Sequence, residues 1–456
     1  MNFDGPVRVA DTAGSGTAAI TLSFEAWKGA SIAPSTHAVT VLPPKVGPKA
    51  EAVAANFIAS LVHPERKASI WEVRFSPDGS RLFVSGYPSG VVQIWDVASR
   101  KELRRIETPP GSRGSADYAL ITPDWKTLYV PVEKSTVKSF ERDGKKLSRV
   151  ENSGTIRVWD LTDGKEQEPL KPTEGTAPVF AKLAPDGRFL VCVERPSYDS
   201  TDTQSKDVTV VWDLETRKKW KLADGYAIPS FAPDGKTVVV CHHDFEAKTS
   251  VIRRVELATG KELARFPCPE KERWFSGGPV SPDGAVVALS LGGKKGAPLE
   301  VWLLDANTLE QRGKVIGKGD PVRYGWSGGG LFTPDSKLYV VGDGVGNLLV
   351  WDVAGSKLER TLATGSDQQA WFPAISPDGK TLAIGWSPKW DLEGVREPDP
   401  RDLPQPRISL VDLTGKNPPR VLIAPHGYSG HCAFSPDGKT LALGSSGAVH
   451  LFDLTK

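Results

Sequence analysis

The chain has 456 residues and nearly balanced charge, with 57 Lys and Arg against 55 Asp and Glu and a formal net charge of +2. Such a balance lacks the extended basic field that nucleic-acid and membrane-surface binders carry, so we expect neither kind of partner. No apolar run approaches the ~20 residues that a membrane-spanning helix needs. The opening "MNFDGPVRVAD" shows no signal peptide, and we expect a soluble, cytoplasmic chain unless further sequence precedes residue 1.

The first 54 residues differ in composition from the rest of the chain. The stretches "PVRVA", "TAAITLSFE" and "THAVTVL" alternate apolar and polar residues, as half-buried strands do. They resemble the closing strands of an immunoglobulin-like sandwich. We therefore expect a β-rich segment over residues 1–43, a linker rich in Pro, Lys and Ala over 44–54, and a second domain over 55–456.

The stretch "FSPDGSRLFVSGYPSGVVQIWDV", residues 75–97, has the local chemistry of three short strands. Pro77 presets φ, Asp78 can accept hydrogen bonds from nearby backbone, and Gly79 tolerates a positive φ, so these residues predict a tight turn. Apolar runs on both sides of the turn indicate paired strands. A second turn at "GYPSG" leads to a third strand that ends in "IWDV".

Near copies of this unit recur along the rest of the chain. Eight turns of the form Pro-Asp-Gly, or a close variant, have their prolines at Pro77, Pro123, Pro185, Pro233, Pro282, Pro334, Pro377 and Pro436. Seven intervals separate the first proline from the last, a mean of about 51 residues, which is in the range of repeat architectures. The turns are followed by exit sequences such as "IWDV" (94–97), "VWDL" (158–161), "VWDL" (211–214) and "VWDV" (350–353).

A fourth strand follows the exit sequence, as in "KELRRIET" (101–108), "KELARFPC" (261–268) and "KLERTLAT" (357–364). Four antiparallel strands per unit, repeated around a channel, are the blades of a β-propeller. The eight turns and four intact Trp-Asp exits resemble the WD-repeat β-propeller family, in a degenerate, bacterial-type form, over about residues 55–456. The resemblance implies an all-β fold of eight four-stranded antiparallel blades, with seven blades plus an irregular unit as the alternative.

The last unit reaches Lys456 directly after "LFDLTK", which leaves no residues for its fourth strand. A strand of the missing type, "NFIASLVHPE" (56–65), precedes the first unit. The resemblance implies that this N-terminal strand completes the last blade and closes the ring. Closure of that kind removes sheet edges that would otherwise pair with other chains.

The repeats depart from the family pattern in their buried polar residues. Family members commonly carry a histidine before the first strand and an aspartate in the second turn, in a network with the tryptophan of the repeat. Here only His63, His426 and His431 approximate that histidine, and Asp-Gly in the second loop occurs only at Asp343-Gly344. We therefore expect blade packing to rest more on aliphatic contacts, and the defined peptide ligands of family members are not implied here.

One motif, "CHHD" at residues 241–244, has the residue types of a metal site. Adjacent residues on a strand point to alternating faces, so at most two of these donors can meet one ion, whereas a metal site needs three or four ligands. The Asp residues of the Pro-Asp-Gly turns and Trp-Asp pairs have structural roles at their turns. We expect no metal, no cofactor and no catalytic residues. Four residues are expected as scattered thiols without a disulfide framework: Cys192, Cys241, Cys268 and Cys432.

Long segments separate the second and third strands in three units, at residues 133–154, 196–207 and 391–407. All three are polar, and we predict them as loops on the rim of the propeller. Loops on a rigid scaffold are common places for binding residues.

One aromatic residue recurs just before or within the first strand of every unit. The eight are Trp71, Tyr118, Phe180, Tyr226, Trp274, Trp326, Trp371 and Tyr428. In a propeller this point lies near the mouth of the central channel. The rings either pack between blades or form an aromatic mouth that binds an extended chain or a partner surface, because aromatic rings bury large areas at low entropic cost.

These features predict a non-enzymatic scaffold that presents a propeller face to a partner protein or an extended peptide. The alternative is a propeller enzyme, a hydrolase or lyase acting in the central funnel. Such an activity needs carboxylates or histidines that converge from equivalent blade positions. The sequence has aromatic residues there, which favours the scaffold.

Overall fold

The computed structural model describes residues 16–22, 35–41, 56–64, 68–87, 90–107, 119–142, 145–201, 206–244, 249–268, 273–292, 300–317, 330–343, 346–364, 369–387, 407–425 and 430–456. Within these residues every regular element is a β-strand. The chain divides into two compact units, Met1–Ala52 and Val53–Lys456. In the first unit β1 (Gly16–Leu22) pairs with the antiparallel β2 (Ser35–Val41). The strand predicted at "PVRVA" lies outside the described residues.

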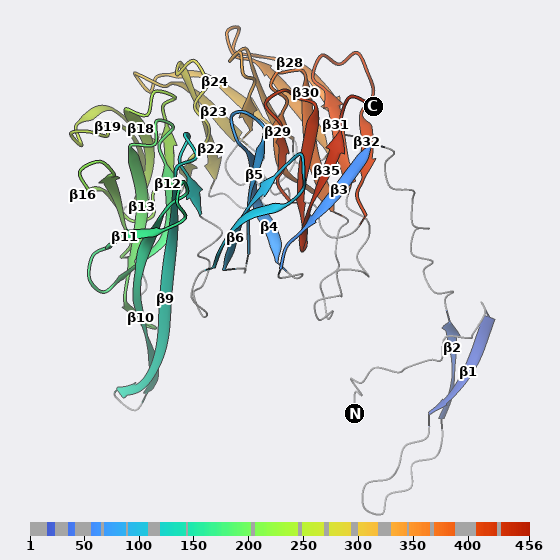
Figure 1. The fold of residues 1–456 in the computed structure, drawn as a ribbon, viewed down its shortest axis with the longest axis horizontal. Helices are drawn as coiled ribbons and strands as arrows, with labels where there is room; N and C mark the ends of the chain where they lie inside the picture. The colour runs from blue at the N-terminus through green and yellow to red at the C-terminus, as the bar shows by residue number, and fades with distance from the viewer. Residues whose placement is uncertain are drawn as a thin grey trace, which may run out of the picture. The chain divides into compact units, whose positions relative to one another are not determined.

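The second unit contains eight antiparallel sheets, blades 1 to 8, arranged as a propeller (Figure 1). Blade 1 consists of β4 (Ser69–Phe75), β5 (Arg81–Tyr87), β6 (Val91–Asp96) and β7 (Glu102–Glu107). Blade 2 consists of β8 (Leu120–Ile121), β9 (Thr127–Arg142), β10 (Lys145–Asp160) and β11 (Glu166–Leu170). Blade 3 consists of β12 (Thr176–Leu183), β13 (Phe189–Pro196), β15 (Val208–Asp213) and β16 (Lys218–Asp224). Blade 4 consists of β17 (Pro229–Phe231), β18 (Thr237–Asp244), β19 (Thr249–Glu256) and β20 (Glu262–Pro267).

The remaining blades follow the same order. Blade 5 consists of β21 (Trp274–Ser276), β22 (Val286–Gly292), β23 (Glu300–Asp305) and β24 (Gln311–Ile316). Blade 6 consists of β25 (Leu331–Phe332), β26 (Leu338–Gly342), β27 (Asn347–Asp352) and β28 (Lys357–Ala363). Blade 7 consists of β29 (Gln369–Ile375), β30 (Thr381–Ser387), β31 (Arg407–Asp412) and β32 (Arg420–Ile423). Blade 8 consists of β33 (Cys432–Phe434), β34 (Thr440–Ser445), β35 (Ala448–Asp453) and the N-terminal β3 (Phe57–Val62). The prediction of eight four-stranded blades is confirmed.

The strand β3 completes blade 8, as the closure prediction requires. The order of this sheet is β3-β35-β34-β33, so a strand from the start of the unit lies beside one from its end. Backbone hydrogen bonds continue beyond the strand at both ends: His63 N donates to Gly447 O over 2.9 Å, and Asp453 N donates to Asn56 O over 2.8 Å. Pairing of these two distant segments closes the ring.

Apolar layers hold each blade against the next. The described residues form eight buried clusters, and each cluster joins two neighbouring blades. Between blades 1 and 2, Phe83 packs in one cluster with Leu128. Between blades 8 and 1, Leu61 of β3 packs in one cluster with Ile70 of β4. This last cluster shows that the ring is closed by packing as well as by strand pairing.

The Pro-Asp-Gly turns lie at one rim of the propeller, here called the turn rim. In blade 1 the Ser76 hydroxyl donates to Asp78 Oδ1 over 2.5 Å, and the Ser80 N–H donates to the same oxygen over 3.0 Å. Gly79 has a φ of 73°, and a methyl group added to it would lie 3.4 Å from Pro436 Cδ in the turn of blade 8. Turns of neighbouring blades therefore lie in close contact along this rim.

The turn rim also contains the turns between third and fourth strands, where the Asp of the Trp-Asp pair caps the chain. Asp96 Oδ1 accepts from the Ser99 N–H over 2.7 Å, and Asp160 Oδ1 accepts from the Thr162 N–H over 2.7 Å. These aspartates therefore have the structural role that their recurrence predicts.

The prediction of a loop over residues 133–154 is wrong. Strands β9 and β10 pair continuously from Thr127↔Asp160 to Arg142↔Lys145 and form a hairpin that extends beyond its blade (Figure 1). The physical reason is visible in the sequence: Thr, Val and Phe favour strands, and Asp-Gly between the strands is a strong hairpin signal. Part of the loop predicted over 196–207 forms β14 (Tyr198–Asp199), which pairs with β10. Residues 391–406 of the third predicted loop lie outside the described residues.

Candidate partner-binding rim

The end of the propeller opposite the turn rim is here called the loop rim. Because the four strands of a blade alternate in direction, the connections from second to third strand and from one blade to the next all leave at this end. The aromatic residues predicted from the sequence stand before or within the first strands, and the strands that the structure describes begin at this rim.

Trp71 lies at an irregularity in the first strand of blade 1. The register of β4 with β5 shifts between Ile70 and Glu72, so Trp71 is the extra residue of a bulge. A bulge re-aims the side chain that it carries. Ile70 is 1% exposed and belongs to the core, whereas Trp71 is 37% exposed. The backbone thus directs part of the indole ring of Trp71 to solvent.

Phe180 and Tyr226 form an aromatic pair between blades 3 and 4. Their ring centroids lie 5.8 Å apart with an interplanar angle of 50°, a favourable arrangement for two rings. Phe180 is half-buried, and Tyr226 is 43% exposed. Phe180 therefore packs against one side of Tyr226, and part of the Tyr226 ring stays accessible to solvent.

The structure describes the side chains of three of the eight predicted aromatic residues: Trp71, Phe180 and Tyr226. Trp274 and Trp371 begin or lie within β21 and β29, but their side chains are outside the described part of the chain. The other three positions are wholly outside it: Tyr118, Trp326 and Tyr428. That these eight residues form one binding mouth stays a prediction.

Charged residues accompany the aromatic residues on the first strands. Arg74 Nη2 lies 2.8 Å from Glu72 Oε1 on β4. Lys182 Nζ on β12 donates to the Pro229 carbonyl oxygen of blade 4 over 3.2 Å, and desolvation by the surrounding strands lowers the pKa of Lys182. Sequence reasoning missed these residues, because nothing in the local pattern separates them from other surface charges.

One residue corresponds to the histidine of the family pattern and has a strongly shifted pKa. Gly430-His431 is a Gly-His dipeptide and stands directly before β33 of blade 8. Burial lowers the pKa of His431 to about 4, while the Glu72 carboxylate acts in the opposite direction. The imidazole is therefore neutral at pH 7.

The tryptophans near the ends of the third strands differ in the partners of their indole nitrogens. The indole N–H of Trp302 donates to Glu300 Oε1 over 2.6 Å, and Lys314 Nζ lies 4.0 Å from the ring centroid. Three other tryptophans bury an indole nitrogen that has no hydrogen-bond partner among the described residues: Trp95, Trp212 and Trp351. Blade packing in these repeats rests on apolar contacts.

The structure describes the side chains of two of the four donors in the "CHHD" motif, Cys241 and His242. Cys241 is buried, and burial raises its pKa to about 12. His242 lines a different space, a groove of about 480 Å³ beside Arg253 and Arg265. The side chains of His243 and Asp244 lie outside the described residues. In the part of the chain that the structure describes, no three His, Cys, Asp or Glu side chains are grouped to hold a metal ion. That the protein binds no metal stays a prediction, which metal analysis of dialysed protein checks.

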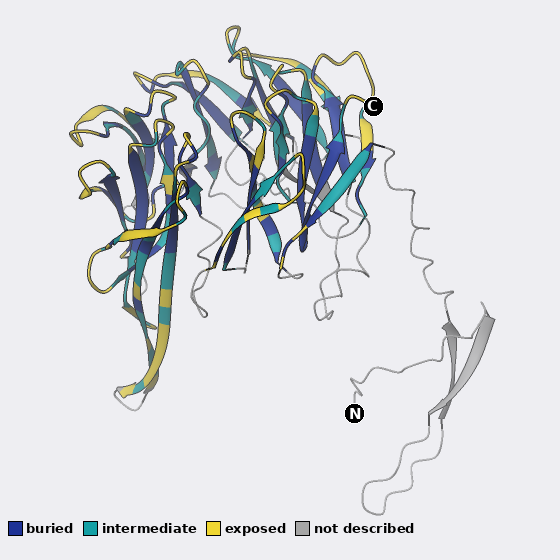
Figure 2. Ribbon diagram, viewed as in Figure 1, coloured by how far each residue is buried: buried dark blue, intermediate teal, exposed yellow. Residues whose placement is uncertain are grey.

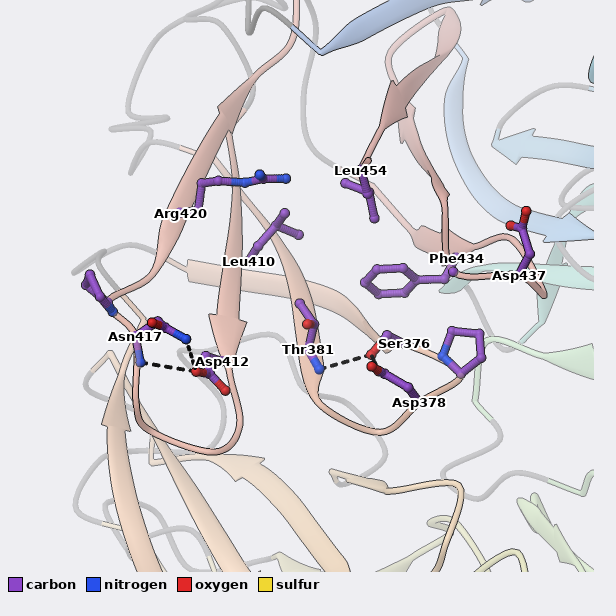
Figure 3. A pocket seen from close by; sticks show the side chains of 13 residues that line it. Ser376, Asp378, Thr381, Leu410, Asp412, Asn417, Arg420, Phe434, Asp437 and Leu454 are labelled. Atoms are coloured by element: carbon purple, nitrogen blue, oxygen red, sulfur yellow. Dashed lines mark hydrogen bonds between the residues drawn. The ribbon is translucent and has the colours of Figure 1, made fainter. Parts of the chain in front are cut away.

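A cleft of about 480 Å³ lies between blades 7 and 8 at the turn rim (Figure 3). Its carboxylates are engaged in their own turns. Asp412 Oδ2 accepts from the Asn417 side-chain amide over 2.7 Å, and hydrogen bonds led by the Thr414 hydroxyl lower the pKa of Asp412 to about 2. Arg420 Nη1 donates to the Lys456 carbonyl oxygen over 3.3 Å. These groups stabilise the turns, and the arrangement has no acid and base facing each other.

The four cysteines, all within the described residues, form no disulfide. Cys192 and Cys241 occupy the second strands of adjacent blades, and burial raises the pKa of both thiols. A raised pKa keeps these thiols protonated and unreactive at pH 7. The described part of the chain also holds no helix of the length and apolarity needed to cross a membrane.

The closed ring of blades, the Pro-Asp-Gly turns and the Trp-Asp exits together define an eight-bladed β-propeller of repeated units. A WD40 family model, described as "WD domain, G-beta repeat", matches residues 56–96. The crystal structure of the C-terminal WD40 domain of Sif2 has the same fold, with a TM-score of 0.55, 12% sequence identity, and coverage of 87% of this chain and 97% of that chain. The chain therefore has the fold of a WD40 β-propeller, and its residues 56–96 match a WD repeat.

Similarity to curated proteins is confined to a smaller part of the chain. Angio-associated migratory cell protein of Homo sapiens is 31% identical over 126 residues, and the proteins of that name from Pongo abelii and Canis lupus familiaris give the same values. The matched segment is 24% of this chain and spans 29% of the length of these relatives.

Proposed function

We propose that the chain is a non-enzymatic protein-interaction scaffold that presents its loop rim to a partner protein or an extended peptide. The observation that carries the proposal is the exposure of Trp71 and Tyr226, at 37% and 43%, on the same rim. Exposed aromatic rings contribute little to the stability of the free chain, but they are enriched among the residues that dominate protein interfaces.

The construction of the rest of the propeller supports the same function. Eight apolar layers hold the blades in fixed positions, and binding residues on a rigid scaffold lose little entropy when a partner docks. The described carboxylates of the turn rim are committed to hydrogen bonds within their turns, as Asp78 and Asp412 show. These features support a binding role over a hydrolase or lyase.

The proposal is tested with the variant Trp71→Ala/Tyr226→Ala in affinity capture, with partners quantified by mass spectrometry. An interface anchor contributes ~2 kcal/mol or more, so partners of the loop rim should be depleted about thirtyfold or more for each ring that they contact. Thermal unfolding should change little, because both rings are partly in water. Leu103→Ala, which truncates an exposed apolar side chain at the turn-rim end of β7, serves as the control.

Two outcomes contradict the proposal. If the double variant captures the same partners in the same amounts as the wild type, the exposed rings are not anchors. If the double variant instead unfolds many degrees earlier, the rings are packing residues of the propeller.

A further inference from the structure

The hairpin of blade 2 projects far beyond the strands of the other blades. Strands β9 and β10 contain 16 residues each, whereas the second and third strands of the other blades contain five to eight. The part beyond the blade, residues 133–142 and 145–154, is here called the arm. At ~3.4 Å per residue it extends about 30 Å. The distal half of the arm is mostly exposed (Figure 2).

The two edges of the arm differ in whether another strand pairs with them. The outer edge of β10 is covered by β14 of blade 3, with Arg149 paired to Asp199 and Val150 paired to Tyr198. A hydrogen bond from the Ser200 N–H to the Ser148 carbonyl oxygen, 2.7 Å long, continues this cover. Within the described residues, β9 pairs in the arm only with β10. One edge is therefore closed, and the other has no strand beside it in the part of the chain that the structure describes.

A row of apolar side chains leads across one face of the arm to this edge. Val137 is paired with Val150, and Val150 is paired with Tyr198, so the three residues lie side by side on three strands. Val137 is 63% exposed, more than any other large apolar residue in the described part of the chain, and Tyr198 is 40% exposed. The row ends at Val137 on the edge strand, where a further strand would extend it.

The opposite face of the same edge is basic. Lys134 and Lys138 stand on either side of Thr136, and alternation along a strand places all three on the face away from Val137. Both lysines are exposed, and Lys138 Nζ lies 2.7 Å from Glu151 Oε2 across the hairpin. Lysines on an edge strand deter pairing between identical copies, because they bring like charges together. The same lysines attract carboxylates.

We propose that the free edge of β9 in the arm takes up an extended segment of a partner protein as an additional β-strand. This segment carries an apolar side chain beside Val137 and acidic side chains beside Lys134 and Lys138. Backbone hydrogen bonds to β9 supply the affinity, and the alternating acidic and apolar residues supply the specificity. The cover of β14 over β10 holds the arm rigid, so strand addition costs little ordering of the arm.

This site is separate from the aromatic residues of the loop rim. It consists of a strand edge, Val137 and two lysines, and peptide binding there does not depend on Trp71 or Tyr226. A binding experiment on the arm therefore remains informative whatever the outcome for the proposed function.

The test uses a fluorescein-labelled peptide of alternating aspartate and valine, about eight residues long, the usual length of a strand. Fluorescence anisotropy should show binding to the full chain, and a peptide of alternating lysine and valine should bind much more weakly. Val137→Asp should raise the Kd about thirtyfold or more, as expected for loss of an anchor, and Lys134→Glu/Lys138→Glu should act in the same direction. Amide hydrogen exchange over residues 134–141 should slow when the peptide binds.

Ile316→Asp is the matched control, because Ile316 is 60% exposed at the end of the edge strand β24 in blade 5. It should bind the acidic peptide as the wild type does, and so should Trp71→Ala/Tyr226→Ala. The proposal is overturned if the acidic peptide does not bind, or if Val137→Asp binds it unchanged. It is also overturned if light scattering shows that the edge is occupied in a dimer that Val137→Asp dissolves. Preferential binding of a single-stranded oligonucleotide, lost in the lysine variant, would overturn it in favour of a nucleic-acid site.

Discussion

The two rims of the propeller are built differently from the same repeat. At the turn rim, the first turn of most blades uses one arrangement: a Ser or Thr hydroxyl donates to the Asp two residues later, as in Ser76–Asp78 and Ser435–Asp437. At the loop rim, the first strands of blades 1, 3 and 7 share a register shift, but the side chains and extensions around it differ. Blade 1 has a bulge at Trp71, blades 3 and 4 share an aromatic pair, and blade 2 extends into the arm.

This difference separates what the fold needs from what a partner can use. Every blade must turn tightly at the turn rim and contact the next turn, so residue choice there is restricted to those that suit the turn. The loop rim has no such common requirement. Exposed Trp71 and the arm contribute little to closing the ring, which leaves these features available for binding.

The largest effect should come from the strand that joins the two ends of the ring. Deleting residues 1–63 removes β3 and leaves the edge of β35 unpaired, and it also removes Leu61 from the layer between blades 8 and 1. We expect the truncated chain to lose cooperative unfolding and aggregate, because open strand edges pair with other chains. Size-exclusion chromatography and calorimetry check this. Deletion of residues 1–50 is the control and should leave the propeller folded; a monomeric 64–456 with unchanged melting would refute closure.

The two rims should respond differently to loss of a tryptophan. Trp125, at the glycine position of the blade 2 turn, is 8% exposed and packs in the layer between blades 1 and 2, whereas Trp71 is 37% exposed. Trp125→Ala should lower the free energy of unfolding by ~3 kcal/mol or more, as for a core aromatic. Trp71→Ala should lower it by less than ~1 kcal/mol. Denaturant titrations of the two variants measure this directly, and equal losses would remove the distinction between the rims.

Acid should affect the two rims over separate pH ranges. Burial lowers the pKa of His431, at the loop rim, to about 4. The imidazole of His431 therefore binds a proton more tightly in the unfolded chain than in the folded chain. That stability is fully present above about pH 6.5 and is lost as the pH falls from there to about 4. At the turn rim, hydrogen bonds led by the Ser76 hydroxyl lower the pKa of Asp78 to about 2, so its contribution is present above about pH 4 and is lost as the pH falls towards 2.

Two variants separate these ranges. Urea unfolding measured from pH 8 to pH 2.5 should show that His431→Gln flattens the loss of stability between about pH 6.5 and 4 and leaves the loss below pH 4. Asp78→Asn should reduce only the loss of stability below about pH 4. A pH profile that His431→Gln leaves unchanged would mean that the imidazole is accessible in the folded chain.

The smallest effects should come from exchanges within the turn rim. Ser336 has a φ of 61°, which costs a non-glycine residue ~1 kcal/mol, but its hydroxyl accepts from the Asp283 N–H over 2.9 Å, a bond that contributes about as much. Ser336→Gly should therefore leave the free energy of unfolding within ~1 kcal/mol of the wild type. Gly79→Ala, at a φ of 73° and without such a bond, should destabilise by ~1–2 kcal/mol. Thermal unfolding of both distinguishes them, and a clear loss in Ser336→Gly would show that the hydroxyl contributes more than it costs.

Much of the fold could be predicted because its signals are local and repeated. A Pro-Asp-Gly turn depends on three residues that adopt the required φ and hydrogen bonds wherever they occur, and eight copies specify the number of blades. The arm was predictable in principle from its β-branched and aromatic residues and its Asp-Gly, but its many charged residues favoured the interpretation as a loop. For the candidate site, the pattern places aromatic residues at the loop rim but does not reveal which of them are exposed.

The sequence by itself determined the repeat, the turn chemistry and the missing strand that β3 supplies, because these depend on short spacings along the chain. Only the tertiary structure decided that Trp71 sits on a bulge while its neighbour Ile70 is buried, since a bulge depends on the register with β5. Only the tertiary structure brought Tyr198 of blade 3 beside Val150 of blade 2 and so closed one edge of the arm. Such contacts join residues far apart in the chain, and their geometry follows from how whole blades pack and not from any local pattern.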